Sequence, residues 1–242
     1  MAVKVITDSI KSISVWMGIS IHVWIVAEED GVTLVDTGLS FMTSSILKEI
    51  DRMNAGPLKR ILLTHGHSDH VGGLKKLLRT HDVPVYMHAK EIPYAEGDLA
   101  YPGKERAYAH VEKGLLQPLP VTAGKNGELA AIGALIPYFT PGHSPGHTVY
   151  YHDKERVLLA GDMLNAKSGR IIPARFTPDP EMAMRSGSDI LRRLDPERME
   201  VCHGGTVFRP AGQLDDLEEG LKQAREAEAR LQARKDSKKR RH

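Results

Sequence analysis

The spacing of hydrophobic and polar positions changes period several times along the first part of the chain. The segment ISIHVWIVAEEDGVTLVDTG at 19–38 holds two apolar, β-branched runs around an acidic turn, which predicts a β-hairpin. Residues 40–53 switch to helical spacing, which predicts a helix with Ser40 as its N-cap. The run KRILLT at 59–64 then predicts a short buried strand that ends at His65.

In the second half of the chain, short strand-like runs again alternate with helical segments. Strand-like runs occur as GALIPYFT, HTVYYHD and ERVLLAG within residues 133–161. Helical spacing covers 179–195, MEVCHGG at 199–205 is expected to form the last strand and its turn, and a charged helix is expected over 215–234. Strands that alternate with helices predict an α/β architecture.

No linker or repeat divides the chain, and we expect a single domain over residues 1–234. Residues 89–120 mix Pro, Gly, Tyr and charge without a clean strand pattern. We therefore expect a helical or irregular excursion there, beside the functional site. The last residues, KDSKKRRH at 235–242, form a basic tail that we expect to be disordered.

Composition narrows the class of protein further. The 33 basic and 31 acidic residues give a net charge of +2, which argues against a nucleic-acid partner. Neither a signal-peptide pattern nor an apolar run of transmembrane length is present, so we expect a cytoplasmic protein with no membrane partner. The single cysteine, Cys202, excludes an intramolecular disulfide and favours a reducing compartment.

Histidines gather in a way that indicates metal binding. The segment THGHSDH at 64–70 packs three histidines and an aspartate together, and such side chains are typical ligands of zinc, iron or manganese. Because alternate residues of an extended chain point the same way, His65 and His67 can hold one ion. The chain then turns into a helix, which directs Asp69 and His70 toward a second ion.

One stretch cannot supply all the ligands of two ions, so further ligands must come from later strand ends. Three later segments place a His or Asp where an apolar strand stops at a glycine: TPGHSPGHT at 140–148, LLAGD at 158–162 and VCHGG at 201–205. The candidates are His143 or His147 in the first segment, Asp162 in the second and His203 in the third.

These motifs follow VTLVDTG at 32–38 in the order seen in the metallo-β-lactamase-fold hydrolases, which the chain resembles over nearly its whole length. That family includes glyoxalase II and bacterial lactonases. The resemblance implies a four-layer αββα sandwich, an α/β fold in which two mixed β-sheets pack between helices. It implies three ligands for a first metal, three for a second and one that bridges both: His65, His67 and His143; Asp69, His70 and His203; and Asp162. Asp36 matches the family's aspartate that supports a ligand histidine.

Two divalent metal ions per chain follow from this resemblance. We expect zinc, although such ligands also accept iron, manganese or cobalt. His147 is expected to be a hydrogen-bonded turn residue, not a ligand. Alternation along the last strand predicts that Cys202 points away from the metals as a small buried hydrophobe. The remaining histidines lack a comparable context and are predicted not to be ligands: His22, His81, His88, His110, His152 and His242.

Two ions about 3.5–4 Å apart can share one hydroxide that is nucleophilic at neutral pH. The expected reaction is hydrolysis of a small ester, thioester, lactone, β-lactam or phosphoester, with Asp69 or Asp162 protonating the leaving group. We expect a mainly apolar and therefore promiscuous pocket, with lactonase, aryl esterase and phosphotriesterase activities. Its expected lining comes from the hairpin tip and from later loops: Trp16, Met17 and Ile19; Phe41, Asn165 and Phe176.

Departures from known subfamilies bear on the substrate. Only residues 204–242 follow His203, which is short for the C-terminal domain of glyoxalase II, and the commonest zinc β-lactamases lack an equivalent of His70. Many acyl-homoserine lactonases carry a tyrosine three residues after the bridging aspartate, where this chain has Asn165, so Tyr138 would have to replace it.

Three further classes of protein stay open at this point. They are a mononuclear iron sulfur-dioxygenase of the same fold, a phosphodiesterase or nuclease, and a non-catalytic binding protein. The complete set of ligand residues favours a two-metal hydrolase over each of them. We expect a small-molecule substrate and a homodimer.

Overall fold

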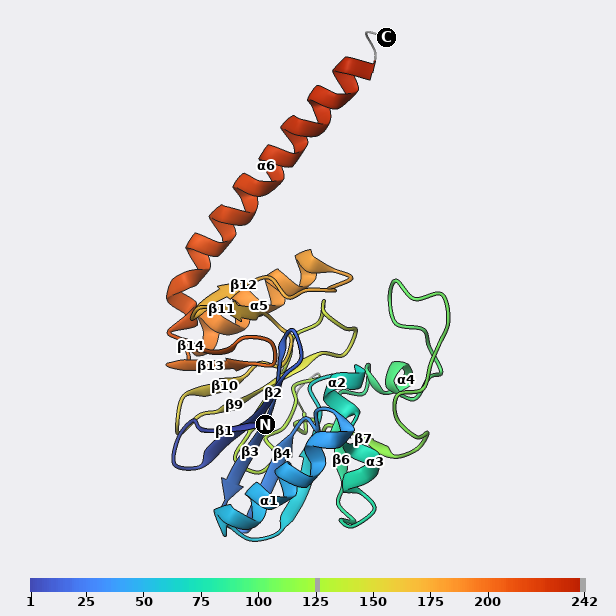
Figure 1. Cartoon of the computed structure of the whole chain (residues 1–242), viewed down its shortest axis with the longest axis vertical. Coiled ribbons are helices and arrows are strands. Elements are labelled where there is room, and N and C mark those ends of the chain that lie inside the picture. Colours follow the sequence, from blue (N-terminus) through green and yellow to red (C-terminus); the bar gives the residue numbers. More distant parts are fainter. Residues whose placement is uncertain (125–126, 240–242) are drawn as a thin grey trace.

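A computed structural model describes residues 1–124 and 127–239 of the chain. Two β-sheets form its centre (Figure 1). The first has the strand order β1-β2-β3-β4-β5-β6-β7, with bounds Ala2–Val5, Ile10–Trp16, Ser20–Glu28, Gly31–Val35, Leu58–Leu62, Val85–Met87 and Leu116–Pro118. The second has the order β14-β13-β10-β9-β8, with bounds Gly205–Phe208, Arg198–Val201, Val157–Leu159, Thr148–His152 and Ile136–Phe139. A separate ribbon pairs β11 and β12, Asn165–Lys167 and Arg170–Ile172.

The first sheet changes from antiparallel to parallel pairing at β4. Strands β1 to β4 pair antiparallel with their neighbours in sequence, whereas β4 to β7 pair in parallel. Every residue of β4 is buried, as expected for a strand covered on both faces. Parallel neighbours need a crossover, and α1 (Thr43–Met53) supplies the one between β4 and β5. The loops that follow β4 and β5 consequently lie at the same edge of the sheet.

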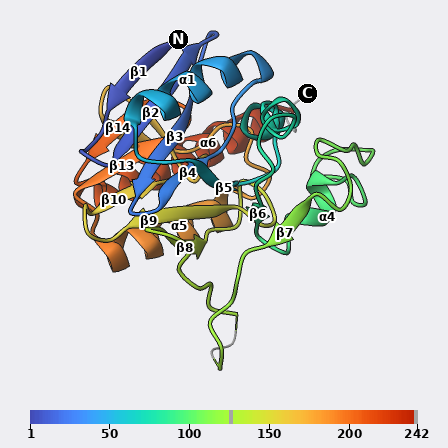
Figure 2. The same ribbon diagram turned by 90° about the horizontal axis from the view of Figure 1, so that it is seen from below.

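The two sheets pack between helices. Helix α1 lies on the side of the first sheet and α5 (Pro180–Leu194) on the side of the second (Figure 2). Alternation along β9 divides its side chains between two buried clusters, because Tyr150 packs with residues of the first sheet while Val149 and Tyr151 pack with Leu191 of α5. Each sheet contains both parallel and antiparallel pairs. The fold is therefore the expected α/β sandwich.

Apart from the last helix, the remaining helices are single turns. They are α2, α3 and α4, with bounds Ser68–Val71, Leu74–Leu77 and Ile92–Ala95, and the 3-10 turns η1 and η2, Ser40–Met42 and Pro210–Gln213. The last helix, α6 (Leu214–Lys239), is long and extends away from the sandwich (Figure 1). Within the described part of the chain, no helix is both long and apolar enough to cross a membrane.

Three local expectations differ from the structure. Ser40 is not the N-cap of α1, because it lies in the 3-10 turn η1 and Met42 precedes the helix without a side-chain cap. The segment 89–120 contains α4 and also the strand β7. The turn after β13 is followed by another strand, β14, which pairs with β13. Strands of three or four residues are too short to show alternation, and partner strands decide their formation.

The charged C-terminal helix is longer than expected. Residues 235–239, placed in a disordered tail by their composition, continue α6, while residues 240–242 lie outside the described residues. The reason is intrinsic propensity. Beyond Gly220 the helix contains chiefly Ala, Glu, Gln, Lys and Arg and no Pro or Gly that would end it.

Candidate metal centre

The loop between β5 and α2 carries the first pair of predicted ligands. His65 is fully buried in this loop, shortly after β5 ends at Leu62, and His67 has an extended backbone conformation immediately before α2. Their side chains converge, with His65 Nε2 and His67 Nδ1 2.9 Å apart. The turn into α2 then changes the direction of the following side chains, so that Asp69 and His70 point to a different place.

His143 completes the first group of predicted ligands. It lies in the loop between β8 and β9, and its Nε2 atom is 3.1 Å from His67 Nδ1. Three nitrogens therefore surround one point, as the grouping of His65, His67 and His143 indicates. Nitrogens bound to one tetrahedral zinc ion at about 2.05 Å would be ~3.3 Å apart, so this spacing fits a metal.

A second group of predicted ligands lies beside the first. His203, in the turn after β13, has its Nε2 atom 3.3 Å from Asp69 Oδ2 and 3.2 Å from Asp162 Oδ2. His70 Nε2 is 3.8 Å from Asp69 Oδ2 and 3.6 Å from Asp162 Oδ1. Both histidines thus face the same two carboxylates.

Asp162 lies between the two groups. Its Oδ2 atom is 3.4 Å from His143 Nε2 and 3.2 Å from His203 Nε2, so one carboxylate reaches ligands of both sets. Asp162 Oδ1 and His70 Nε2 are buried without a hydrogen-bond partner among the described residues. Buried polar atoms are rarely left unpaired, and a metal ion would satisfy both. The donor set of histidines and carboxylates suits zinc, iron or manganese.

The predicted role of Asp36 has a clear geometric basis. Asp36 Oδ2 lies 2.7 Å from His70 Nδ1, which leaves His70 Nε2 directed toward the second group. The same carboxylate accepts hydrogen bonds from the Thr64 backbone N–H and hydroxyl. Asp36 is fully buried and has φ +58°, a left-handed conformation that non-glycine residues seldom adopt. Tight packing after β4 therefore maintains a strained residue at a position that orients a ligand.

Two more ligand histidines are oriented by groups that the sequence did not indicate. His203 Nδ1 lies 2.7 Å from the Ser20 carbonyl oxygen at the start of β3, to which it can donate. His143 Nδ1 lies 3.1 Å from the Thr177 hydroxyl. Backbone carbonyls carry no sequence signal, and both partners are remote from their histidines in the chain.

His147 has the structural role predicted for it. Its ring is fully buried, with Nδ1 2.9 Å from the Thr140 hydroxyl. Its Nε2 atom accepts a hydrogen bond from the backbone N–H of Asp162. His147 therefore positions Asp162, and among the described residues it joins none of the groups of candidate ligands. Of the remaining histidines predicted not to be ligands, none in the described part of the chain joins a ligand cluster, and His242 lies outside the described residues.

Electrostatics prepare these side chains to bind a cation. Burial lowers the pKa of His67 to about 3, and burial also lowers the pKa values of His65 and His143, so these imidazoles are neutral at pH 7. Burial alone would raise the pKa of Asp69, but His70 and a hydrogen bond with His203 outweigh it and lower it to about 2. The first group thus presents neutral nitrogens, and Asp69 presents an anionic oxygen, the forms that coordinate metals. In the second group, the neighbouring carboxylates outweigh burial and raise the pKa values of His70 and His203, so a metal ion would have to displace a proton from each of them.

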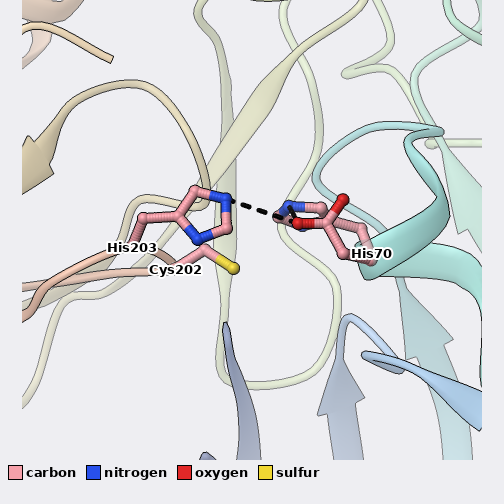
Figure 3. Close-up of side chains that lie close together, drawn as sticks. His70, Cys202 and His203 are labelled. Atoms are coloured by element: carbon pink, nitrogen blue, oxygen red, sulfur yellow. Dashed lines mark ion pairs between the residues drawn. The ribbon is translucent and has the colours of Figure 1, made fainter. Parts of the chain in front are cut away.

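Cys202 does not point away from this centre. Its sulfur lies within 4.8 Å of ligand atoms of Asp69, His70 and His203 (Figure 3). The predicted burial of Cys202 is correct, since the residue is fully inaccessible. The predicted direction is wrong because β13 ends at Val201, so the alternation of a strand no longer applies at the next residue.

Glu91, in the segment 89–120, joins two of the ligand loops. It is fully buried, and its carboxylate accepts hydrogen bonds from the backbone N–H groups of Gly66 and Gly146. The hydroxyls of Tyr101 and Ser144 donate to it as well. Gly66 separates His65 from His67, and Ser144 follows His143, so this one carboxylate holds the loops of all three first-group ligands. Nothing in the local sequence marked it.

A cavity of about 640 Å³ opens over both groups of ligands, and four of the predicted pocket residues line it: Trp16, Ile19, Asn165 and Phe176. Met17 and Phe41 are exposed and do not line it. A second cavity of about 520 Å³ adjoins the centre on the side of segment 89–120. His67, Asp69 and Phe176 line both cavities, so the two meet at the ligand cluster.

A family model described as the metallo-beta-lactamase superfamily matches residues 17–230. The chain belongs to the metallo-β-lactamase superfamily. Probable metallo-hydrolase YybB of Bacillus subtilis is 36% identical over 192 residues, which cover 78% of this chain and 83% of YybB. A hydroxyacylglutathione hydrolase of Bdellovibrio bacteriovorus is 30% identical over 159 residues, 62% of this chain and 51% of that enzyme. The structure of TTHA1623 in a di-iron-bound form is 27% identical, with a TM-score of 0.61 over 81% of this chain and 93% of its own.

Proposed function

We propose that this superfamily member is a hydrolase of small esters, thioesters, lactones or phosphoesters that uses two divalent metal ions. The observation that carries the proposal is the position of Asp162 between two sets of ligands. When bound, two ions would polarise a carbonyl or phosphoryl oxygen and lower the pKa of a water molecule toward neutrality. Zinc is the expected ion, because histidine and carboxylate ligands suit it.

The chain's own side chains would complete the reaction. Asp69 has a partly exposed carboxylate and lines both cavities, so it can accept the proton that the attacking water loses and pass it to a leaving group in either of them. Trp16 and Ile19, at the tip of the β2–β3 hairpin, cover one side of the first cavity with apolar surface. Asn165 lines the same cavity, and its buried Oδ1 has no partner among the described residues, so it can accept a hydrogen bond from substrate.

Among the substrate classes, a thioester or ester has more support than an acyl-homoserine lactone. One relative is named a hydroxyacylglutathione hydrolase, and glutathione acylated on its sulfur is a thioester. Tyr138, the candidate for a lactonase-like role, lies on β8 with the Arg193 guanidinium over its ring and does not line the first cavity. We therefore rank lactonase activity below hydrolysis of open-chain esters.

The experiment that tests the proposed function is elemental analysis of protein purified without added metal, with ester and thioester hydrolysis measured on the same sample. We expect about two metal ions per chain, loss of hydrolysis on chelation, and recovery when zinc is returned. One iron per chain with oxygen uptake and no hydrolysis would instead indicate a mononuclear dioxygenase. Absence of any bound metal would refute the ligand assignment.

The cavities also indicate the charge of the substrate. Lys167 and Arg175 line the first cavity, and Lys104 and Arg106 line the second. Within the described part of the chain, none of these four side chains takes part in an ion pair or a hydrogen bond, whereas the acidic residues in the lining are the ligands Asp69 and Asp162. Unpaired cations around a reaction centre attract anions. We propose that the preferred substrate carries a carboxylate or phosphate.

Charge reversal in the second cavity tests this preference. For the double variant Lys104→Glu and Arg106→Glu we expect KM for a carboxylate-bearing thioester to rise at least about thirtyfold, since two attractions of about 1 kcal/mol each are lost. KM for a neutral aryl ester should stay within about twofold. Lys75→Glu, an exposed lysine on α3 outside both cavities, makes the same type of change and serves as control. Equal effects on the charged and the neutral substrate would contradict an anionic substrate.

A further inference from the structure

We propose that Cys202 is a direct thiolate ligand of the second metal ion, which would then have a sulfur donor in addition to Asp69, His70 and His203. The proposal rests on the metal centre of the proposed function and adds a ligand to it. Binding would break the S–H bond and release its proton to solvent as the sulfur–metal bond forms. The consequence is that the two metal positions differ in chemistry, the first with nitrogen donors and the second with sulfur.

The geometry places the sulfur among the ligands. Cys202 Sγ, His70 nitrogen, His203 nitrogen and a carboxylate oxygen of Asp69 all lie within 4.8 Å of one another (Figure 3). Zinc binds sulfur at about 2.3 Å and imidazole nitrogen at about 2.1 Å, so two such donors on one tetrahedral ion are ~3.6 Å apart. Shortening the separations by at most ~1.2 Å would therefore bring all four atoms into one coordination sphere.

A second observation is independent of the cysteine. His70 is fully buried, and its Nδ1 atom is already paired with Asp36, yet its Nε2 atom has no hydrogen-bond partner among the described residues. His70 belongs to the same cluster as the sulfur. Leaving a buried polar atom unpaired costs about 1–3 kcal/mol. A cation shared by His70 and Cys202 removes this cost.

The backbone explains why two consecutive residues can face one ion. The Cys202 N–H donates to the Gly161 carbonyl oxygen at 2.9 Å, which fixes the cysteine beside Asp162. The His203 carbonyl oxygen accepts from the N–H of Ala166 at 3.0 Å. Cys202 and His203, in the turn after β13, are therefore both hydrogen-bonded to the segment 161–166, which carries Asp162. These bonds hold the sulfur and the His203 ring on the same side of the chain.

A sulfur ligand changes which metals the second position prefers. Thiolates favour zinc, cobalt or similar thiophilic ions, whereas carboxylate and water ligands suit manganese and magnesium. We therefore expect the second position to discriminate against manganese, although a site of only histidine and carboxylate would accept it. Cys202 is fully buried, so the sulfur is also protected from oxidants in solution.

Absorption spectroscopy of the cobalt-substituted protein tests the proposal without an activity assay. We expect a near-ultraviolet sulfur-to-cobalt charge-transfer band that appears with the second equivalent of cobalt. Because Cys202 is the chain's one cysteine, such a band cannot arise from another thiolate. Two bound cobalt ions without the band would overturn the sulfur ligand and leave the two-metal proposal intact. Failure to bind cobalt or zinc at all would overturn both.

Substitution gives a second measurement. Cys202→Ser keeps about the same side-chain size but replaces the sulfur with oxygen. Cys202→Ala removes the donor atom and leaves a small apolar side chain. In both variants we expect the band to vanish and zinc affinity at the weaker position to fall at least tenfold, while affinity at the stronger position is unchanged. Preference for zinc over manganese should fall as well in a competition titration. Unchanged zinc affinity and selectivity in both folded variants would refute the ligand role, and the wild-type spectrum decides the question if neither variant folds.

Discussion

Asp162→Asn is expected to lower the rate of ester hydrolysis by about 10³-fold and to reduce the bound metal to one ion or fewer per chain. The carboxylate lies within 3.4 Å of His143 Nε2 and 3.2 Å of His203 Nε2, so this anionic group contacts both ligand sets. Asparagine has the same shape but no charge. Loss of a shared anionic ligand should cost ~4 kcal/mol of transition-state stabilisation, which corresponds to this factor in rate.

The measurements for this variant are kcat with a thioester substrate and metal content by elemental analysis. Asp153→Asn is a matched control, because Asp153 is exposed in the turn between β9 and β10 and makes the same chemical change far from the ligands. The control should keep both metals and wild-type kcat. An Asp162→Asn enzyme with two metals and kcat within tenfold of wild type would show that the bridging assignment is wrong.

The convergence of the candidate ligands could be predicted from the sequence because these residues carry local signals. His65 and His67 have the alternate spacing of an extended chain, and Asp162 stands where an apolar strand stops at a glycine. Such strand ends converge in an α/β sandwich, and the family pattern distinguished His143 from His147. The structure brings the predicted ligands together into neighbouring clusters that share His65 and His70.

The groups that support the ligands could not be predicted in the same way. The Ser20 carbonyl oxygen beside His203 is a backbone atom, and every residue has one. Glu91 lies in a segment whose irregular pattern gave no helix or strand over most of its length. Its partners are brought to it by the tertiary fold, so that burial, and not local sequence, identifies its role.

Two expectations that differ from the structure concern residues just beyond the end of a strand. The direction expected for Cys202 extended the alternation of β13 past Val201, where the strand stops. Met17 was expected in the pocket as part of the whole hairpin tip, but β2 ends at Trp16 and a turn follows. Trp16, the last residue of β2, and Ile19, before β3, line the cavity, whereas Met17 in the turn does not. Side-chain direction is well specified by sequence only while a strand has a partner.

Glu91→Ala is expected to destabilise the protein by about 4 kcal/mol and to weaken binding of the first metal at the same time. The substitution removes the acceptor of hydrogen bonds from Gly66, Tyr101, Ser144 and Gly146, all of which lie in a buried environment. Each buried donor left without an acceptor costs about 1–3 kcal/mol, and water entering the space would recover part of the total. Urea denaturation of metal-free protein measures this loss.

A control in the same segment isolates the loss of stability. Glu112 is exposed, and its side chain has no ion-pair or hydrogen-bond partner within residues 1–124 and 127–239. For Glu112→Ala we therefore expect the free energy of unfolding to change by less than ~0.5 kcal/mol. A Glu91→Ala protein as stable as this control would show that the four donors find new partners without the carboxylate.

The conservative variant Glu91→Gln separates metal binding from stability. It keeps the shape of the side chain but brings an amide N–H₂ against groups that are themselves donors. We expect it to unfold at an intermediate urea concentration and to bind zinc at least tenfold more weakly at the histidine position, as replacement of residues that support metal ligands does. Among the described residues, Glu91 makes no hydrogen bond or ion pair with a predicted ligand side chain. Weaker zinc binding in a folded Glu91→Gln protein would therefore arise from displacement of the two loops. Unchanged zinc affinity would mean that the loops keep their positions without this carboxylate.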